Sequence, residues 1–390
     1  MLWLGACTSS IGTWMQVVAQ SWLVLQLSGS AFLLGLDSFL GQIPIFLFSL
    51  VGGVVADRMD RRKLLVGSQV VQMTCAFTLA SLFAFYHVHV WNILMLSFIV
   101  GLAQSFGGPA YQALIPTLVE PVDLPNAIAL NSIQFNLARV IGPMLGGIAL
   151  TKLGAAWCFS MNGLSFIAVI ITLLLLPMRP LPKKTGATML DSMKEGIRFI
   201  RQKQGLPPLI VLAFFMTFLG VPLLVFLPVV VRDVFHMTGK EGAKIFTILL
   251  CVSGAGAVAG ALSVAAFGHI KNKGQVALVS MVALGALIVA FAVSRWLPLT
   301  CVFLFLSGSA LMALFSMISS LVQLIVPDEV RGRVMSVYNV AFRGGMPIGS
   351  LIGGTLVATL SIPVVLAVNG VLLSCLGLYF LILQKDVARL

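Results

Sequence analysis

The chain has 390 residues, of which 59% are hydrophobic and only 9% are charged. A water-soluble protein of this length has more surface than so few charges can cover, so the composition predicts that much of the surface faces lipid. The net charge of +12 alone would suggest nucleic acid as a partner. Because the basic residues cluster beside long apolar segments, we expect membrane lipids around the protein and no nucleic-acid partner.

Apolar segments of membrane-spanning length follow one another along the chain. Crossing the hydrocarbon takes about 20 residues, and a backbone in lipid must bond within its own segment. The strands of a β-barrel would alternate polar and apolar residues, which segments 157–176 and 276–293 do not. The sequence therefore predicts an all-α membrane protein with twelve transmembrane helices, at about 2–27, 31–56, 64–86, 91–114, 126–150, 157–177, 208–231, 243–268, 275–294, 298–325, 334–359 and 363–384.

The second predicted helix carries a charge and ends in a basic loop. Asp37 lies about 9 Å from the outer end of this helix, at a rise of about 1.5 Å per residue. The loop runs from Gly53 to Lys63 and includes Asp57, Arg58, Arg61 and Arg62. A carboxylate at such a position gains about 1–2 kcal/mol beside the N-terminus of a neighbouring helix. For Lys63 we expect only a role in setting the membrane topology.

The fifth predicted helix combines a charge with small residues. Arg139 lies within a pattern typical of close helix packing, because small residues let two backbones approach and proline permits a bend. This pattern consists of Ala138, Gly142, Pro143, Gly146 and Gly147.

A polar segment at 179–206 separates residues 1–178 from residues 207–390, and we expect each of these two parts to be a six-helix bundle. Within the segment, one face of a predicted amphipathic helix carries Met189, Met193, Ile197 and Ile200, while Lys194, Arg198 and Arg201 lie off that face. Such a helix either rests on the inner membrane surface or is a solvated linker.

The second half of the chain repeats features of the first. Arg343 and Pro347 follow Arg139 and Pro143 at the same spacing of 204 residues. A six-helix unit repeated in the same orientation implies two bundles related by an axis along the membrane normal, with a midplane site between them.

The distribution of lysine and arginine predicts the orientation. If the first helix starts inside, seventeen of these residues lie in cytoplasmic segments and five in external segments. We therefore expect both termini in the cytoplasm of a multi-pass protein, of the bacterial inner-membrane type.

Three charges fall within predicted spans, where charges are costly and functional by default. They are Asp37, Arg139 and Arg343. We hypothesise that Asp37 is the protonation site and that Arg139 is its partner or an anion-binding residue. An Asp37–Arg139 or Asp37–Arg343 pair is compatible with the expected depths. The alternatives are a structural ion pair and, for Asp37, a carboxylate that faces water at the outer rim.

The loop from Gly53 to Lys63 resembles the signature of the major facilitator superfamily between helices 2 and 3. It fits at Gly53, Asp57, Arg58, Arg61 and Arg62 and departs at Asp60, where glycine is usual. The resemblance covers the whole chain, and Trp14, Gln16 and the segment 107–110 look like the efflux branch that includes enterobactin and macrolide exporters.

This resemblance implies a function and roles for residues. It implies alternating access, a cytoplasmic gate latched by the Asp57 loop against the start of helix 11, and export signalled by the helix 5 pattern. It also implies a cavity lined by helices 1, 4, 7 and 10, whose candidates are Trp14, Gln16, Gln20, Gln104, Tyr111, Phe214, Phe218, Met312, Ser316 and Gln323. Exporters of this superfamily often carry an arginine in helix 4, which this chain lacks.

We therefore expect a monomeric secondary transporter that exports a hydrophobic or amphipathic small molecule by proton antiport. An importer or lipid flippase of the same fold is the alternative, and a membrane receptor or enzyme is a distant third. The sequence has no phosphate-binding loop of the ATP-binding type and no metal-ligand spacing. We therefore expect no cofactor, no metal and an ion gradient as the energy source.

Overall fold

The computed structural model describes residues 2–85, 88–176, 189–266, 272–384 and 387–388; the side chains of residues 57, 121 and 189–192 lie outside this description. The chain divides into two compact units. Unit 1 comprises residues 1–186 and 238–251, and unit 2 comprises residues 187–237 and 252–390. Residues 179–188 of the predicted linker lie outside the described part of the chain.

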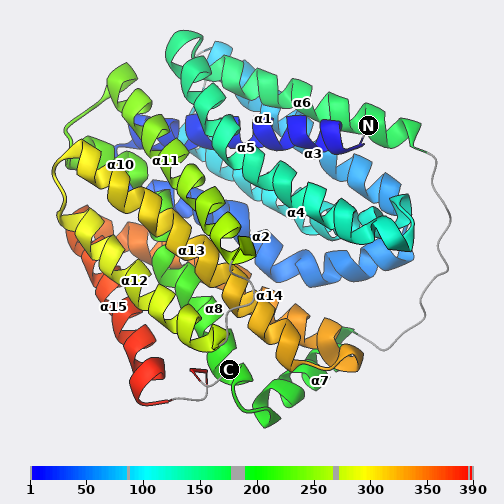
Figure 1. The fold of residues 1–390 in the computed structure, drawn as a ribbon. Helices are drawn as coiled ribbons and strands as arrows, with labels where there is room; N and C mark the ends of the chain where they lie inside the picture. The colour runs from blue at the N-terminus through cyan, green and yellow to red at the C-terminus, as the bar shows by residue number, and fades with distance from the viewer. Residues whose placement is uncertain (1, 86–87, 177–188, 267–271, 385–386, 389–390) are drawn as a thin grey trace. The chain divides into compact units, whose positions relative to one another are not determined.

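Unit 1 consists of six long helices, a short 3-10 helix (η1, Pro121–Asp123) and the first half of α11. In Figure 1 these six run from blue through cyan to green. They are α1 (Leu2–Ser28), α2 (Ala31–Arg58), α3 (Arg61–Ala84), α4 (Val90–Leu118), α5 (Leu124–Lys152) and α6 (Ala155–Leu175).

The neighbours of these helices form a simple pattern. Helix α1 packs on α5 and α6, α3 packs on α4 and α6, and α2 packs mainly on α4. At two points on the α2–α4 contact the backbones nearly touch: a Cβ at Gly101 would lie 2.4 Å from the carbonyl oxygen of Gly41, and one at Gly52 would lie 2.1 Å from that of Ser105. The close approach holds α2 and α4 as a rigid pair.

Unit 2 repeats this pattern. Its elements are α7 (Met189–Gln202), α8 (Leu206–Gly220), α9 (Pro222–Val225), α10 (Leu227–Asp233), the second half of α11 (Gly239–Ala266), α12 (Lys273–Val293), α13 (Leu297–Ile325), α14 (Asp328–Thr359) and α15 (Ile362–Ile382). Helix α8 packs on α14 and α15, and α12 packs on α13 and α15. Glycines 256 and 260 of α11 meet the α13 backbone, as α2 meets α4, so the helix neighbours of unit 2 correspond to those of unit 1.

Eleven helices of the described residues are long and apolar enough to cross a membrane. Helix α1 has 27 residues, which is long enough to cross a membrane. It is not among the eleven because its polar residues lower its mean hydropathy. The helices lie within a few residues of their predicted bounds, except that the predicted span at 208–231 is interrupted. It forms three pieces, because Pro222 is the first residue of α9 and Pro228 the second residue of α10, and a proline cannot donate a backbone hydrogen bond to the preceding turn.

The amphipathic helix α7 packs against α14. A Cβ at Gly196 would lie 2.8 Å from the carbonyl oxygen of Arg333, and the side chain of Arg333 forms an ion pair with Glu195. Ile200 is buried, while Lys194 and Arg198 are exposed. Part of the apolar face of α7 therefore packs against α14. The sequence predicts either a helix on the membrane surface or a solvated linker, and neither includes this contact.

Candidate functional site

A buried carboxylate lies among three helices of unit 1. Asp37 on α2 is only 7% exposed. Gln20 Nε2, from α1, donates to both of its oxygens at 3.0 and 2.9 Å, and Ser97 Oγ, from α4, donates to Oδ1 at 2.5 Å. A charge buried at membrane depth needs such partners because it has lost its water. Among the residues that the structure describes, the partners of Asp37 are thus all uncharged.

Two further amides extend this site along α1 to α6. Gln16 Nε2 donates to Gln20 Oε1 at 3.3 Å, and Asn162 Nδ2 donates to Gln16 Oε1 at 2.6 Å. Gln16 and Gln20 share a helix face, as their spacing of four residues predicts. At the far end, Ser165 Oγ donates to Asn162 Oδ1 at 3.2 Å. The chain of polar groups therefore joins α6, α1, α2 and α4 (helices labelled in Figure 1).

The hypothesis that Arg139 pairs with Asp37 is wrong. Arg139 lies over the ring of Trp14, with its guanidinium carbon 5.9 Å from the ring centroid, a cation–π arrangement. None of the ion pairs among the described residues involves Asp37 or Arg139. Depth alone matched the two residues, but they face different neighbours around their helices. Arg343 lies in unit 2 and is exposed on α14.

The predicted packing pattern of α5 lies against α1. A Cβ at Gly142 would lie 2.3 Å from Trp14 Cβ, and one at Gly146 would lie 2.8 Å from Met15 Cα. Gly147 meets the side chain of Thr247 in the first half of α11, and Ala138 and Pro143 are buried. In unit 2, Gly345 and Gly349 meet α8 in the same way.

The basic loop is held by carbonyl groups of its own unit. Arg61 donates to the carbonyl oxygens of Ala56 (3.3 Å) and Ala113 (2.9 Å), and Arg62 donates to those of Leu174 and Leu176. The carbonyls of Ala56, Leu174 and Leu176 lie at the ends of α2 and α6, where the last carbonyls of a helix have no partner within it. The predicted role of these two arginines in a cytoplasmic gate stays a prediction.

Other residues of the loop have different outcomes. Asp60 caps α3 by accepting from the backbone nitrogens of Arg62 (2.9 Å) and Lys63 (3.4 Å). This cap explains why an aspartate stands where the signature of the major facilitator superfamily usually has glycine. Gly53 has open space beside its Cα, whereas its neighbour Gly52 is the tightly packed one. Arg58 is exposed. The side chain of Asp57 lies outside the described part, so its latch stays a prediction.

The remaining predicted cavity residues lie in both units and stay predictions. In unit 1, Gln104 Nε2 donates to Gln72 Oε1 at 3.1 Å, and Tyr111 Oη donates to Asn131 Oδ1 at 3.0 Å. In unit 2, Phe214 and Phe218 stack with their centroids 5.6 Å apart. Met312 and Ser316 are half-buried on α13, and Gln323 is exposed.

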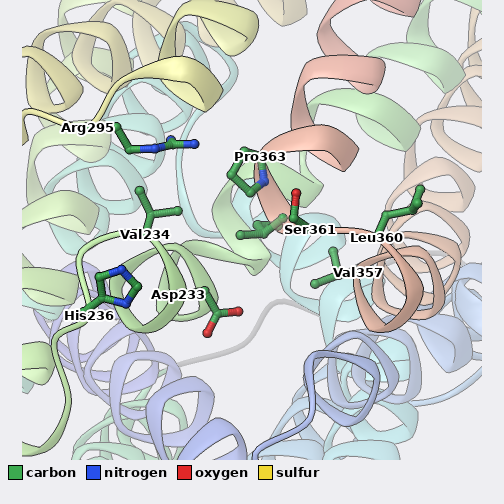
Figure 2. Close-up of a pocket in the computed structure, with 9 residues that line it drawn as sticks. Asp233, Val234, His236, Arg295, Val357, Leu360, Ser361 and Pro363 are labelled. Carbon is green, nitrogen blue, oxygen red and sulfur yellow. The ribbon is translucent and has the colours of Figure 1, made fainter.

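Sequence reasoning missed Ser97 and Asn162. Each is one of several uncharged polar residues in an apolar helix, and only a search for every buried hydroxyl and amide in the spans would have included them. It also missed a cavity of about 340 Å³ in unit 2, shown in Figure 2. Asp233, His236, Arg295 and Ser361 line it together with apolar residues from the ends of α14 and α15.

The arrangement of helices is that of the major facilitator transporters. A D-xylose–proton symporter matches with a TM-score of 0.77 at 14% identity, covering 99% of this chain and 98% of that one. The nucleoside transporter NupG matches with a TM-score of 0.71 at 15% identity, covering 98% and 99%. At these identities the likeness establishes the fold.

The chain belongs to the transmembrane secretion effector family of this superfamily, whose model matches residues 1–387. It is 23% identical to macrolide efflux protein A of Streptococcus pyogenes, over 97% of this chain and 93% of the relative. It is 24% identical to the multidrug efflux pump Tap of Mycolicibacterium fortuitum, over 91% and 88%. It is 26% identical to the enterobactin exporter EntS of Citrobacter koseri, over 94% and 86%. The protein is therefore a multi-pass membrane transporter of the efflux and secretion type.

Proposed function

We propose that this transporter works as a monomer by alternating access and exports a hydrophobic or amphipathic small molecule in exchange for protons that bind Asp37. The observation that carries the proposal is the carboxylate of Asp37, which is buried in unit 1 and bonded only by Gln20 and Ser97 among the described residues. An acid that uncharged groups surround can exist both as an anion and in the protonated form.

The substrate class follows from the relatives and from the chemistry of α1 and α8. The named relatives handle macrolides, several drugs or enterobactin, which are large molecules with both polar and apolar surface. The predicted cavity positions on these helices carry amides and aromatic rings, such as Gln16 and Phe214, which suit such molecules.

The packing of α5 on α1 supports alternating access. At Gly142 and Gly146 the two backbones are too close for any side chain, so α1 and α5 should move together as one body. Together with the excess of lysine and arginine in the predicted inner loops, this supports an inner-membrane exporter with cytoplasmic termini and an inner gate at the Asp57 loop.

The test is transport by the purified full chain in proteoliposomes, with radiolabelled erythromycin and ethidium as probes and an imposed pH gradient. We expect the gradient to drive accumulation of at least one probe. Asp37→Asn should lower this accumulation at least tenfold while exchange of probe for probe continues. The matched control is Asp123→Asn, because Asp123 is exposed at the start of α5. Gradient-driven transport by Asp37→Asn would disprove the coupling role, and failure with both probes would contradict the substrate class.

A further inference from the structure

The amide groups that lead to Asp37 all point one way. Each donates toward the carboxylate, from Asn162 to Gln16, from Gln16 to Gln20 and from Gln20 to Asp37. If Gln20 turned over so that its oxygen faced Asp37, its nitrogen would face the nitrogen of Gln16, and each further amide would have to turn as well. The three amides therefore keep their orientation together, and Gln20 remains a hydrogen-bond donor to Asp37.

Ser97 has the opposite property, because its hydroxyl has a choice of acceptors. Ser97 Oγ lies 2.5 Å from Asp37 Oδ1 and 2.9 Å from the carbonyl oxygen of Ile93, one turn earlier in α4. It also accepts from Gln20 Nε2 at 2.8 Å. A hydroxyl has one proton to donate and two lone pairs, so Ser97 can bond either acceptor by rotation about a single bond.

We propose that Ser97 is the positioning residue that lets Asp37 exist in two protonation states without leaving a buried polar group unpaired; this rests on the proposed function, in which Asp37 takes up a proton. With Asp37 ionised, Ser97 donates to Oδ1. When a proton from water binds Oδ1, the new O–H donates to Ser97 Oγ, and the Ser97 proton turns to the Ile93 carbonyl. Gln20 donates to the carboxyl group in both states.

No charged residue of the described helices α1, α3 or α4 lies near Asp37 to take up the proton in its place. Helices α1 and α4 contain no Asp, Glu, Lys, Arg or His within their bounds. The charges of α3 at residues 61–63 lie in its first turn, at the opposite end of α2 from Asp37. His89, which precedes α4, is exposed and eight residues from Ser97. The remaining titratable groups of these helices are Cys7, Cys75 and Tyr111, and Tyr111 bonds toward α5.

The test is an infrared pH titration of the purified full chain, which needs no substrate. The protonated-carboxyl band that is present in wild type and absent in Asp37→Asn reports Asp37 alone. Ser97→Ala removes a hydrogen bond made to the anion, so the pH at which half of Asp37 is protonated should rise by about one to two units. Ser97→Thr keeps the hydroxyl and should restore the wild-type midpoint.

Ser105→Ala is the matched control, because Ser105 is a fully buried serine of the same helix whose hydroxyl donates to the carbonyl of Leu102. Its midpoint should equal that of wild type. If Ser97→Thr does not fold, Ser97→Cys, a weaker donor, should give an intermediate midpoint. An unchanged midpoint in Ser97→Ala, or no restoration by a folded Ser97→Thr, would overturn the inference. Because the readout is independent of transport, a failure of the proposed function would be recognised separately.

Discussion

Gln20 Nε2 lies 3.0 and 2.9 Å from the two carboxylate oxygens of Asp37, so one amide of α1 spans both oxygens of a buried acid on α2. Helices α1 and α2 make few other contacts compared with α1–α5 or α2–α4. The pair therefore links two tightly packed helix pairs, α1–α5 and α2–α4, through a group whose charge can change. Movement between these pairs should depend on the state of Asp37.

Replacing Gln20 should destabilise unit 1. Gln20→Leu leaves the ionised Asp37 with Ser97 as its remaining described donor and removes the acceptor of Gln16. The loss of hydrogen bonds to a buried charge should cost about 1–3 kcal/mol. Thermal unfolding in detergent measures this cost, with Gln26→Leu, an exposed position of the same helix, as the control. Equal melting temperatures for the two variants would contradict the prediction.

Adding a side chain to α5 should force α1 away. In Gly146→Val the new Cβ would lie 2.8 Å from Met15 Cα and 2.9 Å from its carbonyl oxygen, and backbone atoms cannot rotate aside. Overpacking of this kind costs about 1–3 kcal/mol, and erythromycin transport should fall with it.

The control for this change is Gly67→Ala. A Cβ at Gly67 in α3 meets nothing within 4 Å, and alanine favours a helix by about 0.8–1 kcal/mol over glycine. Gly67→Ala should therefore melt slightly higher than wild type. A Gly146→Val protein as stable and active as Gly67→Ala would show that the α1–α5 contact is loose.

Arg61 should not be replaceable by lysine. Its guanidinium reaches the carbonyls of Ala56 and Ala113 from two different nitrogens, a geometry that the single ammonium of lysine does not reproduce. We expect Arg61→Lys to lose about 1 kcal/mol of stability and most transport of the probes. Lys63→Gln, at an exposed neighbouring position, should lose neither. The prediction fails if Arg61→Lys retains full stability and activity.

Helix α7 should be held on α14 more by shape than by charge. Gly196→Leu introduces atoms where the Arg333 carbonyl lies 2.8 Å from the ideal Cβ position, whereas Arg333→Gln removes only an ion pair whose side chains are 34% and 50% exposed. Such exposed pairs contribute about 0.2–1 kcal/mol.

Limited trypsin digestion at the exposed Lys194 and Arg198 measures how firmly α7 is attached. Cleavage should be fastest in Gly196→Leu, slightly raised in Arg333→Gln, and unchanged in Gly332→Ala, where a Cβ meets nothing within 4 Å. The reverse order of the first two variants would mean that charge dominates.

Much of the fold could be predicted from the sequence because membrane insertion is a local property. Length and apolarity decide whether a segment forms a helix across the membrane whatever its neighbours are. The predicted bounds therefore agree with helices such as α2 and α13 to within a few residues. The break at Pro222 was missed because a proline in a transmembrane helix is often tolerated, and only the surrounding packing decides whether the helix continues.

The sequence by itself determined the spans, the repeat and the presence of one acid within the second helix. Tertiary structure decided which groups meet that acid, because each residue step turns a helix by about 100° and the rotation of each helix about its axis depends on its neighbours. Depth along the membrane therefore suggested Arg139 as the partner of Asp37, whereas packing brought Gln20 and Ser97 to it. For the same reason Gly52 packs on α4 and the adjacent Gly53 does not.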